Sequence, residues 1–176
     1  MRQSDLVAHT DALFRAIGVT VVRFQQIEQW LAEELALLLR MREKEDQYLV
    51  SAAMSFKQKV DLFVDLFPKR GAQPPKLSEV NVRVVRNALE KAEEFRNRVV
   101  HSFYAVECGE VTRWVRMKGS LKGRAGFSLN SAETNIEIFE KCNAALQVIR
   151  EWRFKETQEI QAAADEIAKH MRDGTI

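Results

Sequence analysis

Arg96, Asn97 and His101 are the residues of this chain whose types and spacing best fit a chemical reaction. A guanidinium can hold a phosphate through two parallel hydrogen bonds, and an imidazole can accept and release protons near neutral pH. An amide one helical turn before a histidine can orient its ring. Together these groups fit the cleavage of RNA by attack of a 2′-hydroxyl, a reaction that needs acid, base and charge stabilisation but no metal.

Arg96 also lies where an arginine is not expected. On a helix that advances about 100° per residue, it falls about 40° from Ala92, inside an apolar stripe. Asn97 and His101 lie one turn apart on the opposite, polar face. The stripe consists of Val85, Ala88, Ala92, Phe95, Val99 and Phe103. Ordinary packing does not explain a core-facing arginine followed by a polar Asn/His pair.

Glu28 is a second charge in an apolar stripe, one turn after Phe24 and three residues before Leu31. A buried charge without a partner is costly, so each of the two needs one. We therefore predict that Glu28 and Arg96 meet between the first and third helices. Such a pair fits a functional site, and it fits equally a core pair that only fixes the register of two helices.

The 176 residues predict one domain over 1–176, because this length buries a core without disulfides. Scarce glycine (7) and proline (3) favour long helices, and a net charge of +2 is too small to argue for nucleic acid by itself. Cys108 and Cys142 fit no metal or redox spacing, which favours reduced thiols in the cytoplasm. We also expect no secretory signal, membrane span, metal or cofactor, because no such motif occurs.

The hydrophobic spacing predicts four long helices, joined by the polar run 42–46 and by residues 69–77 with their glycine and two prolines. The helices cover residues 4–40, 49–67, 78 to about 104, and 130 or 131 to about 150. A thin apolar seam continues over residues 150–176. We expect this C-terminal helical extension either to be a solvated tail or to pack on a second copy of the chain.

A β-hairpin is predicted over residues 104–117, with Cys108-Gly109-Glu110 as its turn and a loop over 118–126. This segment is rich in cationic and aromatic residues, a mixture that binds single-stranded RNA; a solvated hairpin and loop is the alternative. The candidates for RNA contact are Arg113, Trp114, Arg116, Lys118, Lys122 and Arg124. Ser102 and Tyr104 either assist the site or only cap and pack.

The motif Arg96-Asn97-x-x-x-His101 resembles the R-x4-6-H signature of HEPN domains, in the form where a polar residue follows the arginine. The order of elements is similar too: two helices, a loop, and the motif at the end of a third long helix. The resemblance implies an all-α bundle of four or five helices, usually homodimeric, here with a small β-hairpin inserted after the third long helix. It also implies a metal-independent endoribonuclease of toxin–antitoxin or defence systems, in which both protomers contribute their Arg and His to one cleft.

Some HEPN toxins extend the motif to R-x4-H-x-Y, with a tyrosine that a partner antitoxin nucleotidylates. Phe103 occupies that position here, and Tyr104 follows it. Inactive relatives keep two alternatives open: a catalytically silent module that binds RNA or protein, and a structural dimeric bundle. Arg96 and His101 are about 140° apart on an ideal helix. Their convergence therefore needs a distorted helix end, a long reach by the arginine, or a second protomer.

Overall fold

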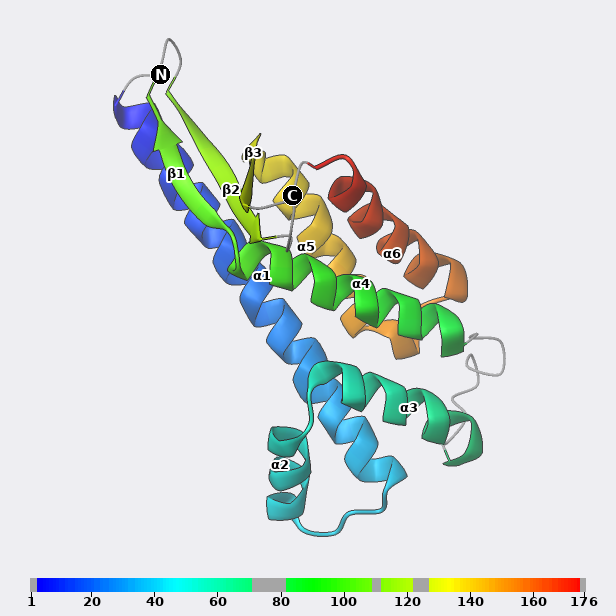
Figure 1. The fold of residues 1–176 in the computed structure, drawn as a ribbon. Helices are drawn as coiled ribbons and strands as arrows, with labels where there is room; N and C mark the ends of the chain where they lie inside the picture. The colour runs from blue at the N-terminus through cyan, green and yellow to red at the C-terminus, as the bar shows by residue number, and fades with distance from the viewer. Residues whose placement is uncertain (1–2, 71–81, 109–111, 122–126, 175–176) are drawn as a thin grey trace.

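The structure, a computed structural model, describes residues 3–70, 82–108, 112–121 and 127–174. Within them the chain forms six α-helices, a 3₁₀ turn and three strands (Figure 1). In chain order these are α1 (Gln3–Leu38), α2 (Lys44–Ala53), α3 (Phe56–Arg70), α4 (Val82–Val100), β1 (Phe103–Glu107), β2 (Arg113–Leu121), β3 (Phe127–Glu133), α5 (Ile136–Arg150), η2 (Trp152–Phe154) and α6 (Thr157–Arg172). The chain is mostly helical, as predicted, but it has more than the four or five helices expected.

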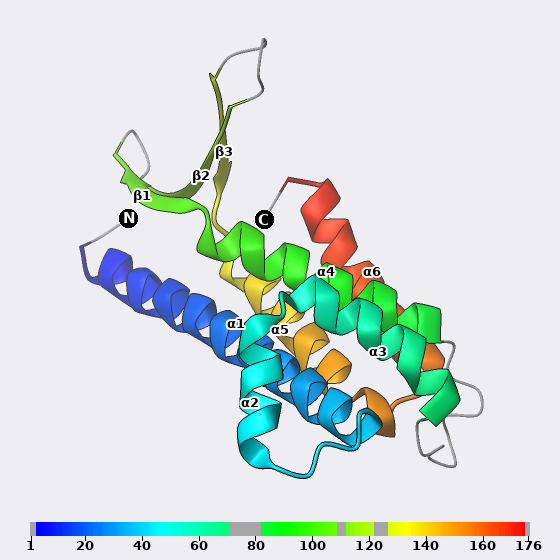
Figure 2. The ribbon, with the colours of Figure 1, turned by 60° about the horizontal axis from the view of Figure 1, so that its bottom comes forward.

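Four helices form the main bundle. The long helix α1 packs along α5, α5 packs against α6, and α6 packs against α4, which also contacts α1. Helices α4 and α6 run in the same direction and α5 runs against them, so the C-terminal ends of α4 and α6 lie together beside the sheet (Figures 1 and 2). Helix α3 lies across α1 and α4 at the opposite end from the sheet, and α2 packs on α1.

The second predicted helix is in fact two helices. Helix α2 begins at Lys44, inside the run expected to be a connection, and ends at Ala53. A new helix starts after Ser55, whose hydroxyl accepts a hydrogen bond from the Gln58 amide N–H at 3.3 Å while the Gln58 side chain accepts from the Ser55 N–H at 2.8 Å. This reciprocal capping explains the break. Pro68 does not end the helix, which continues to Arg70.

The predicted hairpin is confirmed, and it belongs to a three-stranded antiparallel sheet of order β1-β2-β3. The loop expected over 118–126 is wrong in part, because β2 extends to Leu121 and pairs with β3 (Leu121 with Phe127). The last long helix therefore starts later than Asn130 or Ser131. Its cap is Asn135, whose side chain accepts a hydrogen bond from the Glu137 N–H at 2.9 Å. The expected start of the third helix at 78 lies outside the described residues.

The seam beyond Arg150 packs within its own chain, so both alternatives predicted for it are wrong. Helix α6 lies against α4 and α5, and its apolar side chains are buried there. Trp152 is also buried, with its ring 5.2 Å from Trp30, 5.7 Å from Phe63 and 5.5 Å from Phe67. The buried apolar side chains of this segment are therefore part of the hydrophobic core.

Replacing Trp152 with Ala should lower the free energy of unfolding by about 3–5 kcal/mol, since the cavity would lie among three other aromatic rings. Phe154, two residues later, is exposed, and Phe154→Ala should change that free energy by no more than about 0.5 kcal/mol. Urea denaturation followed by circular dichroism measures both. Equal, small effects would mean that this segment does not pack on the bundle.

Candidate functional site

The predicted catalytic residues lie at the C-terminal end of α4. The helix ends at Val100, and the His101 N–H donates a hydrogen bond to the Asn97 carbonyl at 3.0 Å. The His101 side chain is exposed, while Arg96 and Asn97 are half-buried. The chain turns at Ser102 and enters β1. Histidine is thus held at a solvent-facing helix end, where it can reach another molecule.

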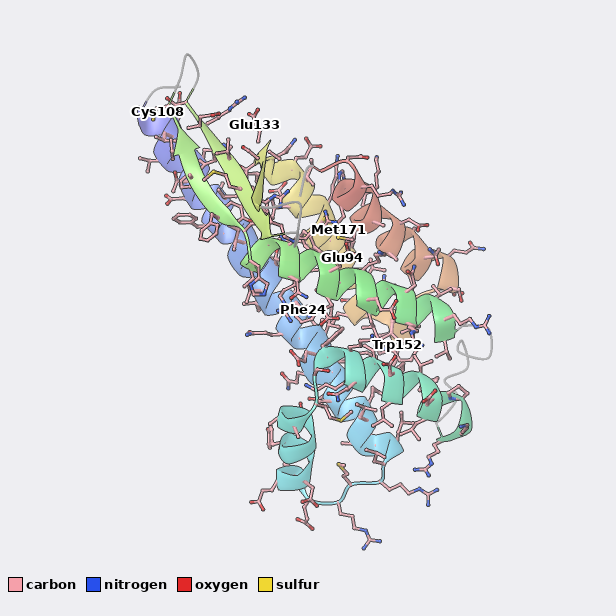
Figure 3. The ribbon with its side chains drawn as sticks, viewed as in Figure 1. Phe24, Glu94, Cys108, Glu133, Trp152 and Met171 are labelled. Atoms are coloured by element: carbon pink, nitrogen blue, oxygen red, sulfur yellow. The ribbon has the colours of Figure 1, made fainter. Side chains whose placement is uncertain are left out.

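Arg96 owes its place in the apolar stripe to an aromatic ring. Its guanidinium carbon lies 4.4 Å from the centre of the Phe24 ring, which is fully buried in α1. Figure 3 shows Phe24 where α3 and the end of α4 approach α1. A delocalised cation over an aromatic face is attracted by the ring's negative charge density, so this position suits arginine without a buried carboxylate.

The predicted Glu28–Arg96 pair is wrong. Glu28 Oε1 instead accepts a hydrogen bond from the Lys59 ammonium of α3 at 2.8 Å. Burial raises the pKa of the Glu93 carboxyl, Arg96 opposes that rise and Glu28 adds to it, so both charges act on Glu93. The Lys59 side chain is 4% exposed and that of Glu28 is 34% exposed. The deeply buried charge of this contact is therefore Lys59.

Lys59 was not among the buried charges predicted from the sequence. It lies three residues after Phe56 and one before Val60, within the stripe that α3 buries. The same criterion that singled out Arg96 and Glu28, a charge among apolar positions of a helix, applies to Lys59 as well. The break at Ser55, which sets where α3 begins, places Lys59 in its first turn against α1.

Ser102 and Tyr104 bind the end of α4. The Ser102 hydroxyl donates to the Arg98 carbonyl, and the Tyr104 hydroxyl donates to the Val99 carbonyl at 3.2 Å. These carbonyls belong to the last turn of α4, where no further turn supplies their partners. Both residues therefore cap the helix end that carries His101.

Arg116, expected to contact RNA, is buried instead, with 8% of its surface exposed. Its guanidinium donates to the Ser102 hydroxyl at 3.2 Å and to the Gly174 carbonyl at 3.5 Å. Burial lowers the pKa of the Arg116 guanidinium. Arg98 donates to the Met171 carbonyl at 2.7 Å, and Figure 3 shows Met171 near the C-terminal end of α6, beside α4. The cationic pair thus meets the negative ends of two helix dipoles.

The other candidates for RNA contact differ in their surroundings. Trp114 is half-buried: its indole N–H donates to the Thr10 hydroxyl at 3.0 Å, and its ring lies 5.8 Å from Phe14, so it packs on α1 rather than standing free. Arg113 is exposed and pairs with Glu107 at 2.8 Å and Glu133 at 3.6 Å. Lys118 lies on β2 opposite Asn130. Lys122 and Arg124 lie outside the described residues.

Comparisons with protein-family models, curated proteins and solved structures find no match to this chain. Among the described residues, no three or more histidine, cysteine, aspartate or glutamate side chains gather where they could bind a metal ion. No helix within that part of the chain is long and apolar enough to cross a bilayer. The site is therefore characterised by its own residues: an exposed histidine at a helix end, and, five residues earlier in the chain, an arginine on an aromatic ring.

Tyr104 should make stability depend on alkaline pH. Burial raises the pKa of its hydroxyl from 10.0 to about 12, although Arg116 opposes the rise. The folded protein holds this proton more tightly than the unfolded chain, so the free energy of unfolding falls as the pH rises from 10 to 12. We expect Tyr104→Phe to be about 1 kcal/mol less stable at neutral pH, because it loses the bond to Val99, and to lack this part of the alkaline loss.

Denaturation of wild type and Tyr104→Phe across this pH range measures the difference. Burial also raises the pKa of the Cys142 thiol to about 12, and this contribution is common to both proteins. Parallel curves would contradict the assignment of the alkaline loss to Tyr104.

Proposed function

We propose that this protein is a HEPN-like, metal-independent endoribonuclease of a toxin or defence system, and that it acts as a homodimer. The observation that carries the proposal is the placement of the R-x4-H motif at the end of α4, with His101 exposed and Arg96, five residues earlier, half-buried. We also propose that an antitoxin binds this protein.

Arg96 is suited to hold the scissile phosphate. Stacking on Phe24 occupies the face of its guanidinium, and among the described residues no carboxylate forms an ion pair with its edge. A planar cation with five N–H donors can then bind two phosphate oxygens at once. The ring that supports Arg96 also limits its rotation, which lowers the entropy lost when a phosphate binds.

His101 is suited to move protons. As general base it takes the proton of the 2′-hydroxyl, whose oxygen attacks phosphorus and displaces the 5′-oxygen of the next nucleotide. A general acid returns a proton to that leaving oxygen, so the products are a 2′,3′-cyclic phosphate and a 5′-hydroxyl. In our proposal the acid is the partner's copy of this histidine, and Asn97 orients the ring of His101.

The surface beside His101 supports a dimer. Val100 precedes the histidine and is exposed, and Phe103 follows it with 71% of its surface exposed. Apolar side chains on both sides of a polar catalytic group suit contact with a second copy. A dimer also supplies the second histidine that acid–base cleavage requires.

A catalytically silent HEPN-like module that binds RNA or protein is the second candidate. The packing of Arg96 on Phe24 favours it, because this contact gives the arginine a structural role without any phosphate. Arg116 and Trp114 form hydrogen bonds within the chain. Among the described residues of the sheet, Arg113 and Lys118 are therefore the cations that remain for contact with RNA.

His101→Ala should lower the rate of RNA cleavage by about 10²–10⁴-fold without a change in stability, because the removed imidazole is exposed. Cleavage of a labelled RNA in EDTA measures it, with His9→Ala on α1 as the matched control. Equal cleavage by wild type and His101→Ala would contradict the proposal. Cleavage that requires a divalent metal would contradict the mechanism.

Phe103→Ser should shift the protein from dimer to monomer and lower cleavage in parallel, since it removes an exposed apolar side chain next to His101. Sedimentation velocity measures the mass, and Phe154→Ser, an equally exposed phenylalanine on η2, is the control. A monomeric wild type that cleaves RNA would show that one copy suffices.

A further inference from the structure

A hollow of about 600 Å³, lined by both polar and apolar side chains, lies between α1 and α2. The residues relevant here that line it are Gln25, Glu28, Gln29, Tyr48, Ser51 and Lys59. Its volume falls in the range of small-molecule sites, and its lining mixes a buried cation, carboxylates, amides and an aromatic ring. None of these groups takes part in the mechanism proposed above.

The Lys59–Glu28 contact lies in the wall of this hollow, and it uses only part of the hydrogen-bonding capacity of Lys59. An ammonium has three donors, and the Lys59 ammonium has one acceptor among the described residues, Glu28 Oε1 at 2.8 Å. A buried ion pair stabilises a fold no better, as a rule, than apolar side chains of the same volume. The remaining hydrogen-bonding capacity of the Lys59 ammonium, in the wall of this hollow, therefore points to a ligand.

The edge of a guanine base matches this pair. Along its Watson–Crick edge guanine presents an acceptor, O6, followed by two adjacent donors, the N1 imino and N2 amino groups. The ammonium of Lys59 can donate to O6, and the carboxylate of Glu28 can accept from both N–H groups. Adenine, cytosine and uracil do not present this order. Tyr48, 74% exposed, supplies a ring at the hollow on which a base can stack.

The hollow also lies close to the proposed phosphate site. Phe24, which supports Arg96, and Glu28 are one turn apart on α1, a rise of about 6 Å. Arg96 and Glu28 both act on the Glu93 carboxyl, whose pKa burial raises. The proposed phosphate site and the hollow therefore adjoin the same stretch of α1.

We propose that the hollow between α1 and α2 binds a guanine base, with Glu28 and Lys59 as the residues that read it. The identification of the ligand as RNA rests on the proposed function. In that function the hollow selects a guanosine next to the scissile phosphate, so that cleavage occurs at G.

Binding of free nucleoside monophosphates tests the hollow without cleavage. By calorimetry or NMR titration, GMP should bind wild type more tightly than AMP, CMP or UMP, and Glu28→Gln should weaken GMP about tenfold or more. Tyr48→Ala, at an exposed position where folding is not at risk, should weaken it as well. Glu137→Gln, which breaks the exposed Glu137–Lys141 pair on α5, is the matched control and should bind GMP as wild type does.

Mapping of the cleaved ends of a mixed-sequence RNA completes the test. Cleavage at G that Glu28→Gln relaxes supports the inference. Glu28-dependent GMP binding without cleavage by wild type supports the guanine site and rejects the nuclease. Cleavage without base preference, together with equal weak binding of all four nucleotides, overturns the guanine site and leaves the nuclease standing. GMP binding that Glu28→Gln and Tyr48→Ala leave unchanged also overturns it.

Discussion

The C-terminal ends of the parallel helices α4 and α6 meet the buried Arg116 and the half-buried Arg98, and this contact fixes the end of the molecule where His101 lies. A buried cation is costly unless oxygen atoms surround it. Arg116 obtains them from Ser102 and from Gly174 beyond α6, and Arg98 obtains them from Met171 and from Glu94. Because Arg116 of β2 joins the turn after α4 to the C-terminal segment, the turn depends on β2 and on that segment together.

The same requirement, a partner for every buried charge, organises the contact of α1, α3 and α4. Arg96 is accommodated by the face of an aromatic ring and Lys59 by a carboxylate, so two cations reside in apolar stripes by different physical means. The two partners, Phe24 and Glu28, lie one turn apart on α1. Arg96 presents donor groups near the end of α4, and Lys59 presents donor groups to the hollow beside α2. Helix α1 therefore connects both sites.

Periodicity predicted the long helices and the hairpin because their apolar positions repeat over many residues. It did not predict that Glu28 pairs with Lys59, because facing positions depend on where α3 begins, and that is decided by the local capping of Ser55 by Gln58. Nor could it tell that Arg116 points inward: alternation along a strand shows which residues share a face, but not which face packs on the bundle. Helix α6 was expected to be a solvated tail or to pack on a second copy because its apolar seam is thin. Two alanines in that seam, Ala163 and Ala164, instead allow close packing against α4 and α5.

Packing explains why some residues in and around the motif are present, but it does not explain all of them. Arg96 covers Phe24, and its loss would expose a core ring, so a defect in an Arg96 variant would not separate structure from chemistry. Ser102 and Tyr104 cap a helix. The His101 imidazole is exposed, and only its backbone N–H continues the helix. Since stability gives little reason for a histidine there, the case for catalysis rests on His101 rather than on Arg96.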